Sequence, residues 1–273
     1  VRDALGIEHT LLNCGHPHSS LSLGPRVHED GEHSVEAVWT NEVHGAIMEA
    51  LVEAKNTAVP ASLRVGRAPV QVGFNRRSIN GDGDVIMLPN TQGAVAPWVN
   101  TLEARNQDGR VIAVLFEHAA HPVIVPTDSA LISADFPGAA VARIHEELGE
   151  SVVPLFAQGC AGNINGFPLR TTHENAEAAG RRLGEAVLEA LNNSVPIQSD
   201  RLEVRSIQKI ALPSQDLPSL EALQETINLI GRRAEASDQY LATTSVRPTD
   251  GDWCGRLDRF NAIKGMVERG ETS

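Results

Sequence analysis

The sequence has few cysteines, few aromatic residues and no long apolar run, and each shortage argues against a class of protein. Its 273 residues include three cysteines, Cys14, Cys160 and Cys254, which are odd in number and lack a Cys-x-x-Cys spacing. Neither a disulfide framework nor a structural zinc ribbon is expected. No apolar stretch approaches the ~20 residues of a membrane-spanning helix, so no transmembrane segment is predicted. Aromatic residues make up 4% of the chain and indicate no lipid-binding groove.

Positive charge is also scarce. The chain carries 23 Lys and Arg against 35 Asp and Glu, which gives a formal net charge of −12 at pH 7. Nucleic acids are bound by clustered Lys and Arg, so no nucleic-acid partner is expected. The same balance disfavours nonspecific attraction to anionic membranes.

Strand and helix patterns alternate between residues 5 and 191 and predict an α/β fold. Apolar runs and alternating patterns predict strands at 5–14, 62–74, 111–117 and 152–158. Apolar residues at helical spacing predict helices at 35–52, 137–148 and 173–191. This order of elements is typical of α/β proteins.

The pattern changes near Pro218, where two amphipathic helices follow, at 220–236 and 253–269. We predict an α/β domain over residues 1–212 and a helical hairpin over 213–273 that extends the same domain. The sequence opens at Val1 rather than at Met and shows no signal peptide, so we expect the natural protein to start earlier.

Histidines gather where two predicted strands end. Four of the ten histidines, His16, His18, His118 and His121, lie in the turns NCGHPHSS and EHAAHP. Residues i and i+2 of an extended chain share a face, and Pro17 favours extended geometry at its neighbour, so His16 and His18 are predicted to face one cleft. Side chains at strand ends of α/β sheets often bind ligands or catalyse reactions.

Two imidazoles from separate strand ends, together with a carboxylate, suit a catalytic zinc site that leaves one position open for water. Such a metal lowers the pKa of its bound water to about 7 and polarises a carbonyl group. No HExxH motif is present, so a zincin helix is excluded. The alternative is a hydrogen-bonded polar cluster at the edge of a sheet, without a metal.

Cys160 offers a second chemistry. Its surroundings, QGCAG, resemble the caspase-type Q-A-C-x-G stretch, with His118 and His121 about forty residues upstream. The residues on both sides of the cysteine depart from that pattern. An inert cysteine in a glycine turn is the competing interpretation.

Several motifs, taken in order, resemble those of the neutral, non-lysosomal ceramidases. The stretch HPHSS…GP at 16–25 resembles their His-Thr-His-Ser-Gly-Pro, and Phe74-Asn-Arg76 resembles their Ile-Asn-Arg. His121-Pro-Val resembles their His-Pro-Val/Thr, with a matching interval to Asp135 in ISADFPG. QGCAGNING resembles their glycine turn Gln-x-x-x-Gly-Asp. The matching blocks cover residues 13–166, over half of the chain.

The resemblance implies an α/β domain with a mixed sheet between helices, and zinc-dependent cleavage of the N-acyl bond of ceramide or of a smaller N-acyl amide. It implies that His16 and His121 bind Zn²⁺, that His18 transfers a proton and that Arg76 helps to hold the substrate or the transition state. Membership would imply a small N-acyl amide or sphingolipid-like substrate and a role in lipid metabolism. It would also imply a secreted or periplasmic location.

The sequence departs from the family pattern at several positions. Ser20-Leu21 replaces the expected Ser-Gly-Pro continuation, and Asn163 stands where the glycine turn usually carries Asp. The family's remaining ligands, a Glu and a Tyr, are not found, since Glu271 lacks the preceding proline and Tyr240 lies in the predicted helical tail. We expect a chain clipped at both ends; the alternative is a non-catalytic α/β binding protein with an incomplete metal site.

Overall fold

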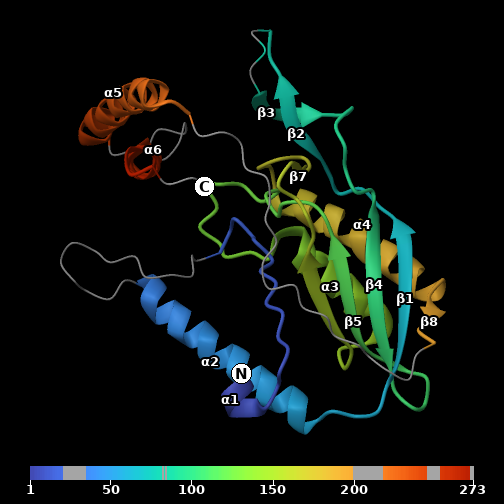
Figure 1. Cartoon of the computed structure of the whole chain (residues 1–273). Helices are drawn as coiled ribbons and strands as arrows, with labels where there is room; N and C mark the ends of the chain where they lie inside the picture. Colours follow the sequence, from blue (N-terminus) through green and yellow to red (C-terminus); the bar gives the residue numbers. More distant parts are fainter. Residues whose placement is uncertain (21–34, 82, 84, 199–217, 245–252, 271–273) are drawn as a thin grey trace. The chain divides into compact units, whose positions relative to one another are not determined.

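The computed structural model describes residues 1–20, 35–81, 83, 85–198, 218–244 and 253–270 (Figure 1). The chain forms two compact units, Val1–Val204 and Arg205–Ser273. The predicted boundary at residue 212 falls outside the described residues, so the division into domains stays a prediction.

A five-stranded sheet forms the centre of the first unit. Its strand order is β6-β5-β4-β1-β8, with antiparallel neighbours except for the parallel pair β5–β6. The sheet is therefore mixed, and the α/β class is confirmed. The strands are β1 (Ser62–Pro69), β4 (Trp98–Arg105), β5 (Val111–His118), β6 (Val153–Gln158) and β8 (Val195–Pro196).

Two helices, α3 (Asp135–Leu148) and α4 (His173–Asn192), pack against each other and lie on one face of this sheet (Figure 1). Their apolar residues meet the inner faces of β4 and β5, which buries Phe116, Ile144 and Leu183 completely. Burial of such side chains contributes about 1.5–3 kcal/mol each. Gly66 of β1 permits this packing, because a Cβ atom there would collide with the backbone carbonyl of Ala190 in α4.

A smaller sheet lies beside the main one. It contains β2 (Gly73–Ile79), β3 (Val85–Asn90) and the short β7 (Ile164–Gly166), in the order β3-β2-β7. Figure 1 shows the β2–β3 hairpin extending away from β7. The small sheet thus brings residues 73–76 next to the turn that follows β6.

A buried ionic cluster joins β1 and β4 near the end of β4 at Arg105. Glu103 in β4 is fully buried and lies directly across from Arg64 in β1. Its carboxylate lies 3.0 Å from Arg64 Nε and 3.2 Å from Arg105, and it accepts a hydrogen bond of 2.6 Å from Ser194. Every oxygen of this buried carboxylate is therefore paired.

His118, at the end of β5, is a second buried polar group. It is 1% exposed, and its Nδ1 donates a hydrogen bond of 2.9 Å to the carbonyl oxygen of Trp98 in β4. Burial lowers the pKa of His118 below its ordinary value of 6.5, and the effect is opposed by the Trp98 carbonyl and by Glu117. The folded protein therefore favours the neutral imidazole.

The strand expected at 5–14 is wrong. Residues 2–5 form the short helix α1 (Arg2–Leu5), and residues 6–14 form no strand. Leu11 and Leu12 are 92% and 72% exposed, so this apolar run is not buried. Asn13 instead anchors the segment through its side chain, which exchanges two hydrogen bonds with Gln158 at the end of β6.

The strand expected at 62–74 is divided. It ends at Pro69, which lacks an N–H for the ladder, and β2 begins at Gly73. Four strands, β3, β4, β7 and β8, were not predicted. The remaining predicted elements up to residue 191 are confirmed, with α2 observed at Val35–Asn56.

The second unit contains two helices, α5 (Leu220–Thr244) and α6 (Trp253–Glu268), as predicted. They pack against each other, and Leu223 and Ile230 of α5 are buried. Lys264 of α6 donates a hydrogen bond of 2.7 Å to Gln224 of α5. Within the described residues, no helix is long and apolar enough to cross a membrane.

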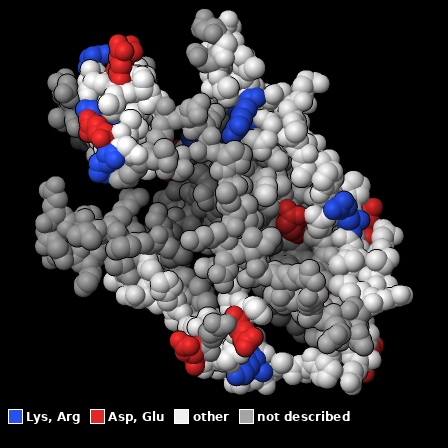
Figure 2. Space-filling view, in the orientation of Figure 1, with Lys and Arg blue, Asp and Glu red and all other residues white. Residues whose placement is uncertain are grey.

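The described charges on the face in Figure 2 stand in small separate groups of both signs. None of these groups forms the extended basic surface that nucleic-acid binding uses.

Replacing Glu103 by alanine removes the shared partner of two arginines, so it should destabilise the first unit. Removing one member of a buried ion pair costs about 3–5 kcal/mol. Arg64 and Arg105 are about 30% exposed and can be hydrated, so we expect about 3 kcal/mol, measured by urea unfolding. Glu147→Ala is the control, because Glu147 pairs with Arg143 at the surface; it should cost less than about 1 kcal/mol. Equal losses would contradict a special role for Glu103.

His118 should make the stability depend on pH. In the unfolded chain it takes up a proton near pH 6.5, whereas the folded protein stays neutral to a lower pH. The unfolded state thus binds more protons in this window, and the free energy of unfolding falls as the pH decreases below about 6.5. His118→Asn cannot titrate but keeps a donor for Trp98. The free energy of unfolding, measured with urea on the metal-free proteins between about pH 7.5 and 5.5, should decrease less steeply in the variant than in the wild type. The same slope in both proteins would contradict this assignment.

Candidate metal site

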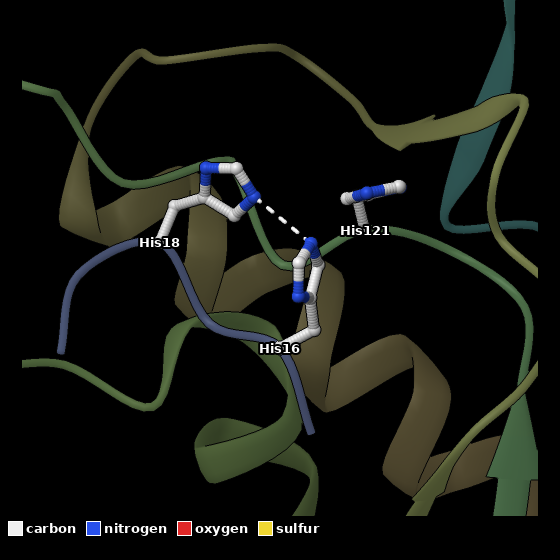
Figure 3. Close-up of side chains that lie close together, drawn as sticks. All are labelled: His16, His18 and His121. Atoms are coloured by element: carbon white, nitrogen blue, oxygen red, sulfur yellow. Dashed lines mark hydrogen bonds between the residues drawn. The ribbon is translucent and has the colours of Figure 1, made fainter. Parts of the chain in front are cut away.

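Three imidazoles from two distant segments meet at one point. His16, His18 and His121 point toward one another (Figure 3), and one ring nitrogen of each lies within 4.8 Å of the others. His18 Nε2 lies 3.3 Å from His16 Nε2. The ring centre of His16 lies 4.9 Å from those of both other histidines. This arrangement can hold a metal ion.

The first two histidines are held by the backbone around them. Asn13, fixed to Gln158 at the end of β6, precedes them, and the His18 N–H donates a hydrogen bond of 3.2 Å to Pro122 O. His16 has a φ of 56°, in the left-handed region. The segment is therefore turned at His16, not extended as the sequence analysis expected, and this turn brings both rings to His121.

His121 is oriented by the turn after β6. Its Nδ1 lies 2.7 Å from Ala161 O and 3.1 Å from Ile164 O. Because carbonyl oxygens only accept hydrogen bonds, Nδ1 carries the proton and Nε2 keeps a free lone pair. This is the tautomer that a metal-binding imidazole needs, with the second nitrogen bonded to the protein.

The surroundings of His18 and His121 favour the neutral form of both imidazoles. Burial lowers the pKa of His18, and His16, His121, Arg170 and Arg76 lower it further. Burial also lowers the pKa of His121, against the effect of its two carbonyl partners, with smaller contributions from Arg76 and His16. Only neutral imidazole binds a metal, so a lowered pKa favours binding near neutral pH.

Arg76 in β2 lies beside the same turn. Its Nε donates a hydrogen bond of 3.1 Å to Gly162 O, and its Nη1 donates one of 3.2 Å to Asn165 Oδ1. Its backbone N–H also bonds to Asn163 O, at 2.8 Å. The guanidinium is thus fixed near the histidines, with Nη2 left without a hydrogen bond among the described residues.

Asp135 supports the site and is not part of the cluster. Its buried carboxylate accepts hydrogen bonds of 2.9 Å from the N–H groups of both Ile124 and Val125, and one of 2.7 Å from Phe136. It therefore fixes the loop that follows His121. Among the described residues, the cluster contains only histidines, and the carboxylate that the sequence analysis expected is not seen.

The other two candidate residues lie outside the cluster. His118 is buried in the core against Trp98, as described above. Cys160 is exposed and free, and within the described part of the chain no hydrogen bond joins it to His118 or His121.

Sequence analysis missed Asn165 and Arg170. Asn165 forms a parallel bridge with His121 and accepts the hydrogen bond from Arg76. Arg170 lies close enough to His18 to lower its pKa. The only signal for Asn165 was its place at the end of the glycine turn, and no motif marks Arg170.

Comparison with known proteins gives partial structural similarities. No protein-family model matches the sequence, and no curated protein matches it. The crystal structure of the neutral ceramidase from Pseudomonas aeruginosa matches 56% of this chain and 26% of its own, with 19% identity and a TM-score of 0.47. A structure described as a ceramidase complexed with C2 matches 56% of this chain and 25% of its own, with 19% identity and a TM-score of 0.48. The chain thus spans about a quarter of the length of the structures it matches.

Proposed function

We propose that this protein is a metal-dependent amidohydrolase that cleaves an N-acyl amide bond. The observation that carries the proposal is the meeting of His16, His18 and His121, beside the fixed guanidinium of Arg76. The ceramidase-like order of motifs in the sequence points to the same bond.

We assign His16 and His121 as the ligands of a Zn²⁺ ion. The donor set fits this metal, because imidazole is a common zinc ligand and His121 presents Nε2 in the required tautomer. When bound, zinc would supply an activated water and polarise the amide carbonyl group. The turn at 161–164 holds His121 in place, and Pro122 and Gln158 hold the segment that carries His16.

His18 is assigned to proton transfer. It lines a cleft, described below, that His16 and His121 do not line. A substrate in that cleft would present its nitrogen to His18. Its lowered pKa keeps the imidazole neutral at neutral pH, so it can accept a proton and then deliver it to the leaving amine.

Arg76 is assigned to the negative charge that develops on the carbonyl oxygen. Its two hydrogen bonds to Gly162 and Asn165 orient the guanidinium before a substrate arrives, and preorganised donors stabilise such charge most effectively.

An apolar cavity beside Arg76 suits the acyl group of the substrate. It is a shallow depression between the β2–β3 hairpin and the chain after β7. Its apolar lining includes Phe74, Met87, Leu88 and Phe167. We propose an N-acyl amide with an apolar acyl chain, a class that includes sphingolipid-like compounds.

The ligand assignment predicts which variants lose metal. His16→Ala and His121→Ala should each lose most of the bound zinc, whereas His18→Ala should keep it; elemental analysis of the purified protein measures this. His44→Ala, an exposed histidine of α2, is the matched control and should bind zinc like the wild type. Loss of zinc from His18→Ala would make all three histidines ligands, and a wild-type protein without affinity for zinc would overturn the proposal.

The catalytic assignment predicts variants that lose turnover but keep their bound metal. His18→Ala and Arg76→Gln should keep zinc, and His18→Ala should lower kcat about 10²–10⁴-fold on an N-acyl amide, as is typical for the loss of an acid–base group. A chelator should abolish turnover.

Cys160→Ala is the control, since its turnover should stay within a few-fold of the wild type and iodoacetamide should have little effect. Inactivation by alkylation together with resistance to chelators would instead identify a cysteine hydrolase.

A further inference from the structure

A second cleft opens beside His18. Its polar lining comes from His18, Ser19, Thr127, Ser129 and Arg170, and Val123 and Val125 also line it. Because His18 lies at its edge, the cleft is suited to the amine half of an amide substrate.

Arg170 is held firmly in the wall of this cleft. Its N–H donates a hydrogen bond of 2.9 Å to Val123 O, and the next residue, Thr171, donates one of 2.7 Å to Ile124 O. These bonds attach Arg170 to the loop that begins at His121. The backbone from which the Arg170 side chain extends is therefore fixed relative to the loop that carries His121.

The backbone at Arg170 is also unusual. Its φ of 52° lies in the left-handed region, which costs free energy for a residue with a Cβ atom. Two other described non-glycine residues share this feature, His16 in the cluster and Asp135 beneath it. Such strained residues tend to gather at functional sites.

The guanidinium of Arg170 has no counter-ion among the described residues. By contrast, Arg64, Arg105, Arg143 and Arg181 each pair with a glutamate. Asp128, in the loop that lines the cleft, is exposed and forms no ion pair with Arg170 within the described structure. Arg170 thus has no paired carboxylate within the described structure, in a chain of net charge −12.

Three hydroxyl side chains also line the cleft, those of Ser19, Thr127 and Ser129. Ser129 Oγ lies 3.1 Å from Nε2 of His173 and accepts a hydrogen bond of 3.2 Å from the N–H of Leu131, so it is fixed. The hydroxyls of Ser19 and Thr127 have no hydrogen-bond partner in the described structure and can donate to a ligand. A single guanidinium with nearby hydroxyl donors matches one carboxylate, which arginine binds through two parallel hydrogen bonds.

We propose that this cleft binds a carboxylate on the amine half of the substrate, so that the substrates are N-acyl amino acids rather than neutral N-acyl amino alcohols. The inference rests on the proposed amidohydrolase function. Hydrolysis would add water across the amide bond and release a free acid from the apolar cavity and an amino acid from the cleft beside Arg170.

A matched pair of substrates tests this inference. N-dodecanoylalanine and N-dodecanoylalaninol differ only in that the second carries an alcohol in place of the carboxylate. The zinc-loaded wild type should prefer the carboxylate at least about 10-fold in kcat/KM, since a charge-assisted hydrogen bond is worth about 10- to 100-fold. Arg170→Gln should bring the ratio close to one, and Arg170→Lys should restore part of it. Arg110→Gln removes the same charge from an exposed turn and should keep the wild-type ratio.

Binding to the metal-free protein, measured by calorimetry, separates this inference from the proposed function. N-dodecanoylalanine should bind about 10- to 100-fold more weakly to Arg170→Gln than to the wild type or to Arg110→Gln. A wild type that hydrolyses both compounds equally, or an Arg170→Gln variant with an unchanged ratio, would overturn the carboxylate site and leave the amidohydrolase intact. A protein that binds the carboxylate through Arg170 but hydrolyses neither compound would overturn the amidohydrolase and leave the carboxylate site standing.

Discussion

The attachment of His121 to the turn after β6 is the contact on which the rest of the site depends. The backbone of His121 exchanges hydrogen bonds with Ile164 O and Gly166 N, both at 3.0 Å, and its ring bonds to the carbonyls of Ala161 and Ile164. These bonds join the end of the main sheet to β7 of the small sheet. The bonds of the ring also fix the tautomer of His121, and the same turn holds Arg76 on β2 through Gly162 and Asn163.

The loop after His121 extends this support to the rest of the site. Asp135 holds its first residues through two backbone N–H groups, and the same stretch accepts the hydrogen bonds that fix Arg170 and Thr171. Pro122 in turn accepts the hydrogen bond from His18. A single loop therefore holds the backbone at three residues with proposed roles: His121 as ligand, His18 in proton transfer and Arg170 in carboxylate binding.

Much of the fold was predictable, because long apolar runs and helical spacing are local signals. The strand at 111–118 and the helices α3 and α4 followed directly from them. The failure at 5–14 has a different cause: an apolar run shows that a segment could be buried, but it does not show whether a neighbouring strand is present to pair with it. Leu11 and Leu12 have no such neighbour and remain exposed.

The meeting of His16, His18 and His121 was predicted, but the backbone geometry expected at His16 was wrong. The i, i+2 argument assumed an extended chain, whereas His16 is left-handed. Arg170 could not be predicted from the sequence, because its position depends on hydrogen bonds to a loop more than forty residues earlier. No local sequence pattern indicates such a pairing.

The turn at 161–164 contacts His121 and Arg76 through the main-chain carbonyls of Ala161, Gly162, Asn163 and Ile164. Main-chain carbonyls are the same in every amino acid. The side chains at 162 and 163 can therefore drift during evolution while the geometry of His121 and Arg76 persists.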